Sequence, residues 1–342
     1  MTDAVADEKL TAREDAALGA VLGALVGDAS GAVLEFFAGA ITSADVEHAL
    51  TLPGGGTWRV APGQITDDGE LTMSLLNALL ESPETPRAAA ARHYARWASS
   101  DPFDIGITTR RSLGCLAVSA WAERGRAAGV EVAMTEAARE LCMASKANGS
   151  LMRATPLAVW GAARSEEALI AAAQADARLS HPNPACVDAG VAYLLAIASL
   201  VRTPGDAPRA LGVARAWAAT NACEEVRGWL DEAEAGVIVP YAPQDGFVRI
   251  AFTHAFRHLG LGTPYVDALR ETLAGGGDTD TNACIIGGLV GARWGARSIP
   301  EPMKATVLGC DTRLGKHARP AELHPRGLRQ SVRALLGAPT DA

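Results

Sequence analysis

The apolar residues of this chain recur mainly with the spacing of an α-helix. Between residues 18 and 26 they occupy one helix face at i, i+3, i+4, i+7 and i+8: Leu18, Val21, Leu22, Leu25 and Val26. A second such set between residues 71 and 80 ends at Ser82-Pro83, because proline cannot continue a helix. Further helices are expected near 86–99, 108–127, 132–144, 153–161, 166–178, 184–201, 207–218, 222–233, 246–259, 264–273, 281–294 and 326–336. Strand signals are limited to short, ambiguous pieces such as 237–239, so we expect an all-α fold.

The composition supports one helical unit. Hydrophobic residues make up 49% of the 342 residues and aromatic residues only 5%, which favours close packing of alanine- and leucine-rich helices. The sequence has neither a repeat of fixed period nor a Pro/Ser-rich linker, so we expect a single domain over 1–342.

The net charge of −8 argues against binding to nucleic acid or to an anionic membrane surface, both of which require a basic face. No uninterrupted apolar run of about 18 residues appears, so no membrane span is expected. The acidic start of the chain lacks an apolar signal core, which makes the cytoplasm the expected location. Six cysteines are scattered singly, a pattern that is poor for zinc binding or for disulfides.

Two short acidic segments, more than 200 residues apart, each precede an expected helix. Together they supply carboxylates and hydroxyls on Thr66, Asp67, Asp68, Asp278, Asp280 and Thr281. Asp and Thr are common N-caps, so helix capping is one interpretation of each segment. Capping needs a single acceptor oxygen, however, and these segments offer many more. If the two segments converge, their oxygens could bind hard divalent cations such as Mg²⁺ or Mn²⁺.

Three further features are ambiguous from the residues alone. Glu35 is an isolated acid between Leu34 and Phe36, and such an acid is either a surface residue or a functional one. The small-residue loop 145–153 could hold a phosphate at a helix N-terminus, although a plain turn is the commoner structure. His181 could contact a ligand, but lone histidines are more often structural.

Six motifs, taken together and in this order, resemble the ADP-ribosylglycohydrolase family. They cover about 15–295 and leave 296–342 as a C-terminal extension: GDASGAVLEF (27–36), TDDGE (66–70), DIGITTRRSL (104–113), SKANGSLMR (145–153), LSHP (179–182) and GGGDTDTNACIIGGLVGA (275–292). The pair of TDD and GGGDTDT is the most specific part. The sequence looks most like the bacterial branch that contains dinitrogenase reductase-activating glycohydrolase.

The resemblance implies an all-α fold with two Mg²⁺ or Mn²⁺ ions. It makes Thr66, Asp67, Asp68, Asp278, Asp280 and Thr281 the metal ligands. It places Glu35 beside the scissile bond and gives Asp104 a role in catalysis. It assigns the diphosphate to Asn148, Gly149 and Ser150, and further ligand contacts to His181 and Phe247. Three positions depart from the family pattern: Gly69 and Ala147 replace a usual threonine and glycine, and Phe247 stands where relatives often carry tyrosine.

The resemblance also implies a function. We expect a metal-dependent hydrolase that releases ADP-ribose from a modified protein side chain, most simply arginine, by cleavage of the N-glycosidic bond. Three alternatives remain open: another ADP-ribose linkage such as that to serine or to a small compound, a noncatalytic ADP-ribose-binding protein, and a hydrolase of the diphosphate itself. A P-loop NTPase is excluded because the GxxxxGK[ST] pattern is absent.

Overall fold

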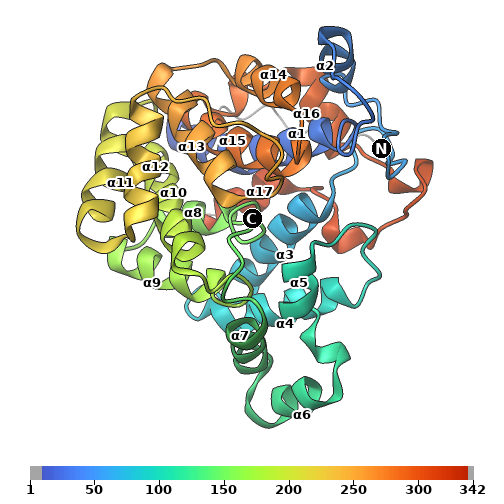
Figure 1. Ribbon diagram of the computed structural model, residues 1–342, viewed down its shortest axis with the longest axis vertical. Helices are drawn as coiled ribbons and strands as arrows, with labels where there is room; N and C mark the ends of the chain where they lie inside the picture. The colour runs from blue at the N-terminus through green and yellow to red at the C-terminus, as the bar shows by residue number, and fades with distance from the viewer. Residues whose placement is uncertain (1–9, 338–342) are drawn as a thin grey trace.

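The protein is built from α-helices, as expected. A computed structural model describes residues 10–337, in which β-pairing is limited to two isolated bridges, Gly55 with Val60 and Ala147 with Phe247. The helices pack around a central pair, α1 and α15 (Figure 1). Their bounds are α1 Ala12–Gly31, α2 Ser43–Ala49, α3 Asp67–Glu81, α4 Pro86–Ala98, α5 Ile107–Ser112, α6 Ser119–Ala128, α7 Val130–Leu141, α8 Thr155–Gly161, α9 Glu166–Ala177, α10 Pro184–Arg202, α11 Ala207–Asn221, α12 Glu224–Glu234, α13 Val248–Leu261, α14 Tyr265–Gly275, α15 Thr279–Trp294, α16 Glu301–Leu308 and α17 Leu328–Leu335.

A row of four glycines on α1 allows the central pair to approach closely. These glycines recur every four residues and therefore lie along one face of the helix: Gly19, Gly23, Gly27 and Gly31. A Cβ atom added at these four positions, in that order, would lie 2.2, 2.5, 2.1 and 2.3 Å from backbone atoms of α15. Only glycine fits there. The close contact brings the C-terminal end of α1, with Asp28, against the N-terminal end of α15, with Asp280.

The expected helix over 108–127 is instead two helices, α5 and α6, separated by a 3₁₀ turn over Cys115–Ala117. Ser112 promotes the break because its hydroxyl donates to the carbonyl of Thr108 (2.8 Å), which competes with the helical pattern. Gly114, two residues further along the chain, is a poor helix former. Two short helices were not anticipated, α2 and α16, and the ambiguous piece 237–239 forms no strand.

Helix α10 lies in the hydrophobic core. With 19 residues and a mean hydropathy of 1.8, it is long and apolar enough to cross a membrane, and it is the one helix of residues 10–337 that meets this test. Asp188 interrupts its apolar run, which is why no uninterrupted apolar stretch of that length appears in the sequence. In the folded chain, 89% of its apolar window is buried inside the protein, as in the core helix of a globular domain.

The segment after residue 295 packs against the rest of the chain. Helices α16 and α17 contact α1. The guanidinium of Arg319 forms an ion pair with Glu70 of α3 (2.7 Å), and both side chains are less than 5% exposed. A buried ion pair of this kind anchors 296–337 to the helix that carries one acidic segment. Two parts of the chain lie outside the described residues. They are the acidic start, in which no signal sequence is expected, and the last five residues of the expected extension.

Candidate active site

Acidic side chains from three helix ends meet at one place in the fold. One carboxylate oxygen each from Asp28, Asp68 and Asp280 lies within 4.8 Å of the other two, and the same holds for Glu35, Asp104 and Asp280. Asp280 belongs to both groups and so joins them. The two acidic segments that are distant in the sequence therefore converge, which is the condition on which a shared metal site depends.

Asp28 also belongs to this cluster, although the sequence analysis did not single it out. Its side chain is fully buried. Its carboxylate accepts hydrogen bonds from the backbone N–H of Thr66 (3.0 Å), the hydroxyl of Thr66 (2.8 Å) and the backbone N–H of Gly69 (2.9 Å). Asp28 thus holds the start of α3 in place. Gly69, which departs from the family pattern, is also constrained, because a Cβ atom there would lie 2.6 Å from the Asp28 carboxylate.

Simple helix capping does not account for the two acidic segments. Neither Thr66, the N-cap of α3, nor Asp278, the N-cap of α15, forms a side-chain capping hydrogen bond. The hydroxyls of Thr66 and Thr281 instead lie 3.2 and 3.3 Å from Oδ2 of Asp68. The other oxygen of Asp68, Oδ1, is buried without any partner. The capping interpretation is therefore wrong for both segments.

The carboxylates strongly disfavour one another's ionisation. Burial, and then the charge of neighbouring acids, raises the pKa of Asp67, Asp68 and Asp280 well above the usual range. Burial raises the pKa of Asp28 to about 7, and burial with the nearby Asp104 raises that of Glu35 to about 8. Crowded carboxylates repel unless protons or cations neutralise them.

This set of donors fits hard divalent cations. Mg²⁺ and Mn²⁺ prefer carboxylate, hydroxyl and water oxygens as ligands. The cluster supplies the carboxylates and hydroxyls, and the cleft can admit water. The unpartnered Oδ1 of Asp68 is the observation that favours a cation most directly, because a buried carboxylate oxygen ordinarily has a donor. Asp28 extends the expected set of ligand groups, either as a ligand or as a support for its neighbours.

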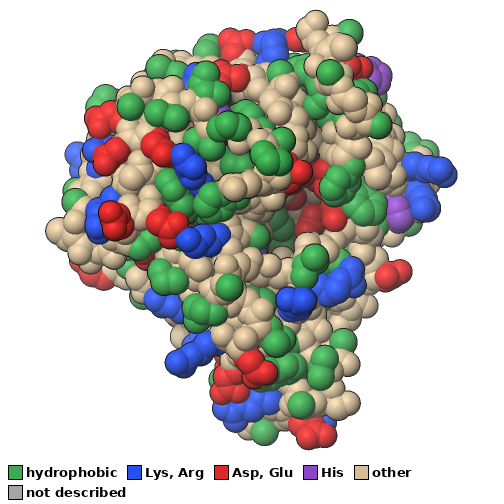
Figure 2. All heavy atoms as spheres, in the orientation of Figure 1, with side chains coloured by type: hydrophobic (Ala, Val, Ile, Leu, Met, Phe, Trp, Pro, Cys, Tyr) green, Lys and Arg blue, Asp and Glu red, His purple; other side chains and the backbone are tan. Residues whose placement is uncertain are grey.

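A cleft of about 450 Å³ opens above the cluster. Figure 2 shows a hollow on this face of the molecule with acidic side chains inside it. Such a volume lies within the range of small-molecule sites. The expected site residues that line the cleft are Glu35, Asp67, Asp104, Asn148, Gly149, His181, Asp278, Asp280 and Thr281. Thr66, Asp68 and Ser150 are buried and are not among the residues that line it.

The loop 145–153 forms part of the cleft wall. The side-chain amide of Asn148 donates to Oδ2 of Asp278 (2.7 Å), so the loop is joined to the acidic segment before α15. Gly149 sits against His181, and a Cβ atom at this glycine would lie 2.9 Å from Cε1 of that imidazole. Burial lowers the pKa of His181 to about 3, so its ring is neutral at physiological pH.

Phe247 is not among the residues that line the cleft. Its ring packs edge-on against Trp229, with centroids 5.7 Å apart, and its backbone pairs with Ala147 of the loop. Phe247 therefore supports the loop from behind, whereas Gly246 reaches the cleft. A different aromatic residue, Phe36, lines the cleft with 68% of its surface exposed. The sequence signal for it was its place directly after Glu35.

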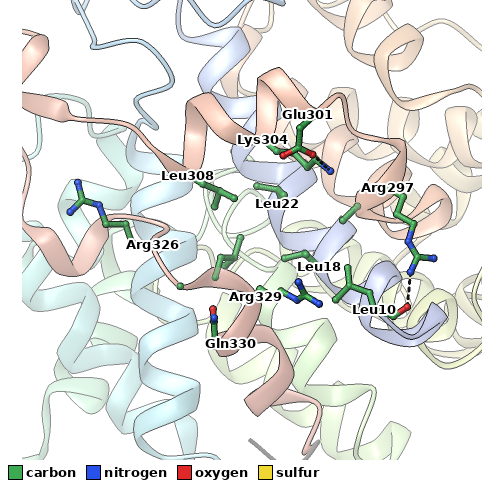
Figure 3. A pocket seen from close by; sticks show the side chains of 13 residues that line it. Leu10, Leu18, Leu22, Arg297, Glu301, Lys304, Leu308, Arg326, Arg329 and Gln330 are labelled. Carbon is green, nitrogen blue, oxygen red and sulfur yellow. Dashed lines mark hydrogen bonds and ion pairs between the residues drawn. The ribbon is translucent and has the colours of Figure 1, made fainter. Parts of the chain in front are cut away.

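A larger cavity, of about 590 Å³, lies elsewhere, between α1, α16 and α17 (Figure 3). It has an apolar floor that includes Leu18 and Leu22, and basic side chains around it. Its one carboxylate, Glu301, is paired with Lys304 at 2.9 Å. This cavity lacks the convergent acids and hydroxyls of the cleft, so the cleft is the better candidate for hydrolytic chemistry.

The fold and the cleft together define an all-helical protein with a carboxylate-rich, metal-compatible active site. The sequence model of the ADP-ribosylglycohydrolase family matches residues 9–330, and the chain belongs to that family. The membership expected from the motifs is confirmed, and with it the assignment to a family of enzymes.

Individual relatives agree with this assignment. The chain is 28% identical over 291 residues to ADP-ribosyl-[dinitrogen reductase] glycohydrolase of Rhodospirillum rubrum, which covers 84% of this chain and 88% of that protein. It is 35% identical over 106 residues to the ADP-ribosylarginine hydrolase Tri1 of Pseudomonas putida, a match that covers 29% of this chain and 27% of that protein. A solved structure entitled ADP-ribosylglycohydrolase-related protein complex shares the fold, with a TM-score of 0.70, 23% identity and coverage of 96% and 97%.

Proposed function

We propose that this protein is a metal-dependent hydrolase that removes ADP-ribose from a modified arginine of a protein. The observation that carries the proposal is the convergence of Asp28, Asp68 and Asp280 beneath a cleft of ligand size. The choice of arginine is supported by the names of two relatives, an ADP-ribosylarginine hydrolase and a glycohydrolase of ADP-ribosylated dinitrogen reductase.

The groups that would hold two Mg²⁺ or Mn²⁺ ions are those of the two acidic segments: Thr66, Asp67, Asp68, Asp278, Asp280 and Thr281. When bound, the ions would neutralise the carboxylates and orient the ribose hydroxyls and a water. Asp28 supports this set through its hydrogen bonds to Thr66 and Gly69. The Asn148 amide holds Asp278 toward the cleft.

Glu35 and Asp104 are the proposed acid–base pair. In the reaction, the bond between ribose C1″ and the arginine nitrogen breaks, water supplies OH to C1″, and a proton goes to the released guanidine. Burial raises the pKa of Glu35 to about 8 and that of Asp104 to about 6. Both acids line the cleft, so one can donate the proton to the guanidine while the other accepts a proton from water. Trp58 orients Glu35, because its indole N–H donates to Oε2 (2.7 Å).

The loop of Asn148, Gly149 and Ser150 is proposed to hold the diphosphate. Gly149 leaves room for a ligand beside His181 because it has no side chain. The neutral His181 ring is a hydrogen-bonding group without a charge, held by Ser180, whose hydroxyl lies 2.8 Å from Nδ1. Phe36 offers an exposed ring at the cleft for packing against the ligand, a role the resemblance gave to Phe247.

Products distinguish the proposal from its alternatives. The full-length protein is incubated with peptides ADP-ribosylated on arginine or on serine, with Mg²⁺ or Mn²⁺ in turn, and mass spectrometry identifies what is released. Free ADP-ribose from the arginine peptide supports the proposal, whereas release only from serine corrects the linkage. AMP would indicate attack on the diphosphate, and no turnover would indicate a binding protein. Asp280→Asn should abolish release, and full activity of this variant would refute the metal assignment.

A further inference from the structure

Two histidines and a glutamate form a second cluster of metal-binding groups, on helices α13 and α14. His254 and His258 are one turn apart on α13 and so share a face, and Glu271 of α14 lies opposite them. One ligand atom from each lies within 4.8 Å of the other two. None of the three lines the cleft, so the cluster is separate from the candidate active site.

The hydrogen bonds of His254 prepare it as a ligand. Its Nε2 lies 2.8 Å from the carbonyl oxygen of Val239. Because a carbonyl can only accept, the proton must be on Nε2, and Nδ1 is left as a bare lone pair. That Nδ1 is buried and has no hydrogen-bond partner in the protein. An imidazole with one nitrogen tied to a carbonyl and the other free is the usual arrangement of a metal-bound histidine.

His258 has the matching arrangement. Its Nδ1 lies 3.1 Å from the hydroxyl of Thr263, and its Nε2 is buried without a partner. Because a hydroxyl can accept as well as donate, this contact allows the tautomer with the proton on Nδ1, in which Nε2 is a second lone pair. Both histidine residues are fully buried, with 0% of their surface exposed. Two unsatisfied imidazole acceptors in one buried place carry a desolvation cost that a cation would remove.

Glu271 completes the cluster and connects it to solvent. Its Oε1 accepts from Nη1 of Arg257 (2.6 Å), which leaves its second oxygen for another partner. The side chain of Glu271 is 40% exposed, so an ion can enter past it. Two imidazoles and one carboxylate, with a water in a fourth position, are ligands that Zn²⁺ favours, whereas Mg²⁺ prefers oxygen alone.

We propose that His254, His258 and Glu271 bind one Zn²⁺ ion that fastens α13 to α14. The site also supports the acidic segment before α15. The ring of Tyr241 stacks on His254, with centroids 4.3 Å apart, and Gly275 packs against the same ring, since a Cβ atom at this glycine would lie 2.1 Å from Cδ2. Gly277, next to Asp278, packs against the carbonyl of Tyr241. The zinc therefore stabilises the wall from which Asp278 reaches the cleft.

The test measures zinc binding and stability and does not depend on turnover. The full-length protein is stripped with a chelator, saturated with Mg²⁺ to fill the acidic cleft, titrated with ZnCl₂, and analysed for bound metal and for its melting temperature. We expect one Zn²⁺ per chain and a higher melting temperature with zinc. Co²⁺ in place of Zn²⁺ should give the absorption bands of a nitrogen-ligated ion.

The variants His258→Gln and Glu271→Gln should weaken zinc binding by about 100-fold or more and should remove the zinc-dependent rise in melting temperature. His93→Gln is the matched control, since His93 also faces a glutamate, Glu81 at 2.8 Å, but at the surface. Melting curves in chelator show that each variant is folded. Zinc binding that is unchanged in both variants, or a wild-type protein that binds no zinc once the cleft is filled, would overturn the proposal.

Discussion

Replacing Asp68 with asparagine should make the metal-free protein more stable while preventing it from binding metal. An oxygen of Asp68 lies within 4.8 Å of oxygens of both Asp28 and Asp280. At an effective dielectric constant of about 20, each such pair of full charges repels by about 3.5 kcal/mol. Burial raises the pKa of these acids, so they are partly protonated and the repulsion is partly relieved. We therefore expect Asp68→Asn to add about 1–3 kcal/mol to the free energy of unfolding without metal.

Urea unfolding in chelator and in Mn²⁺ measures both effects. In chelator the variant should unfold at higher urea than the wild type. In Mn²⁺ the wild type should gain stability and the variant should not, and ADP-ribose release should be lost. The matched control is Asp231→Asn, an exposed acid that pairs with Arg215 and should change stability by less than about 1 kcal/mol. The reasoning is refuted if the variant is less stable in chelator and is still stabilised by Mn²⁺.

Three further outcomes are expected. Gly149→Ala should raise KM about 10-fold with unchanged circular dichroism, because its Cβ would lie 2.9 Å from His181; normal kinetics would contradict this. Glu70→Gln should lower the free energy of unfolding in urea by about 3–5 kcal/mol by leaving Arg319 buried without its charge partner; a loss below about 1 kcal/mol would count against it. Burial lowers the pKa of the His181 imidazole from 6.5 to about 3, so between these two pH values the unfolded chain binds a proton that the folded chain does not. The free energy of unfolding should therefore fall as the pH drops from 6.5 toward 3, by up to about 1.4 kcal/mol per pH unit. His181→Gln should remove this slope, so its stability relative to the wild type should improve from pH 7 to pH 4.

The helical class could be predicted from the sequence because apolar periodicity is a local property. The two acidic segments could be identified too, since each contains more carboxylates than a helix cap uses. Their convergence could only be stated as a condition, because it depends on how α1 and α15 pack. The glycine row that decides this packing is visible in the sequence, but its partner surface is not.

Asp28 could not be assigned a role for the same reason. Within α1 it is one acid among small and apolar residues, and its importance comes from Thr66 and Gly69, which approach it from another helix. Phe247 is the reverse case, a residue that was assigned a ligand contact but does not line the cleft. Its position suggested contact with the ligand, whereas the pairing of its backbone with Ala147 turns the ring toward Trp229. Both cases depend on contacts between residues that are distant in the sequence.

The glycine row on α1 also determines where inactivating mutations should occur. Gly19 lies twelve residues from Gly31, which corresponds to about 18 Å along the helix, yet a methyl group at either end would push α1 and α15 apart. Because the two helices are stiff, a displacement at the far end would move Asp28 relative to Asp280. A saturation scan for activity should therefore reveal a stripe of sensitive positions that runs along α1 away from the cleft, in addition to the ring of residues around it.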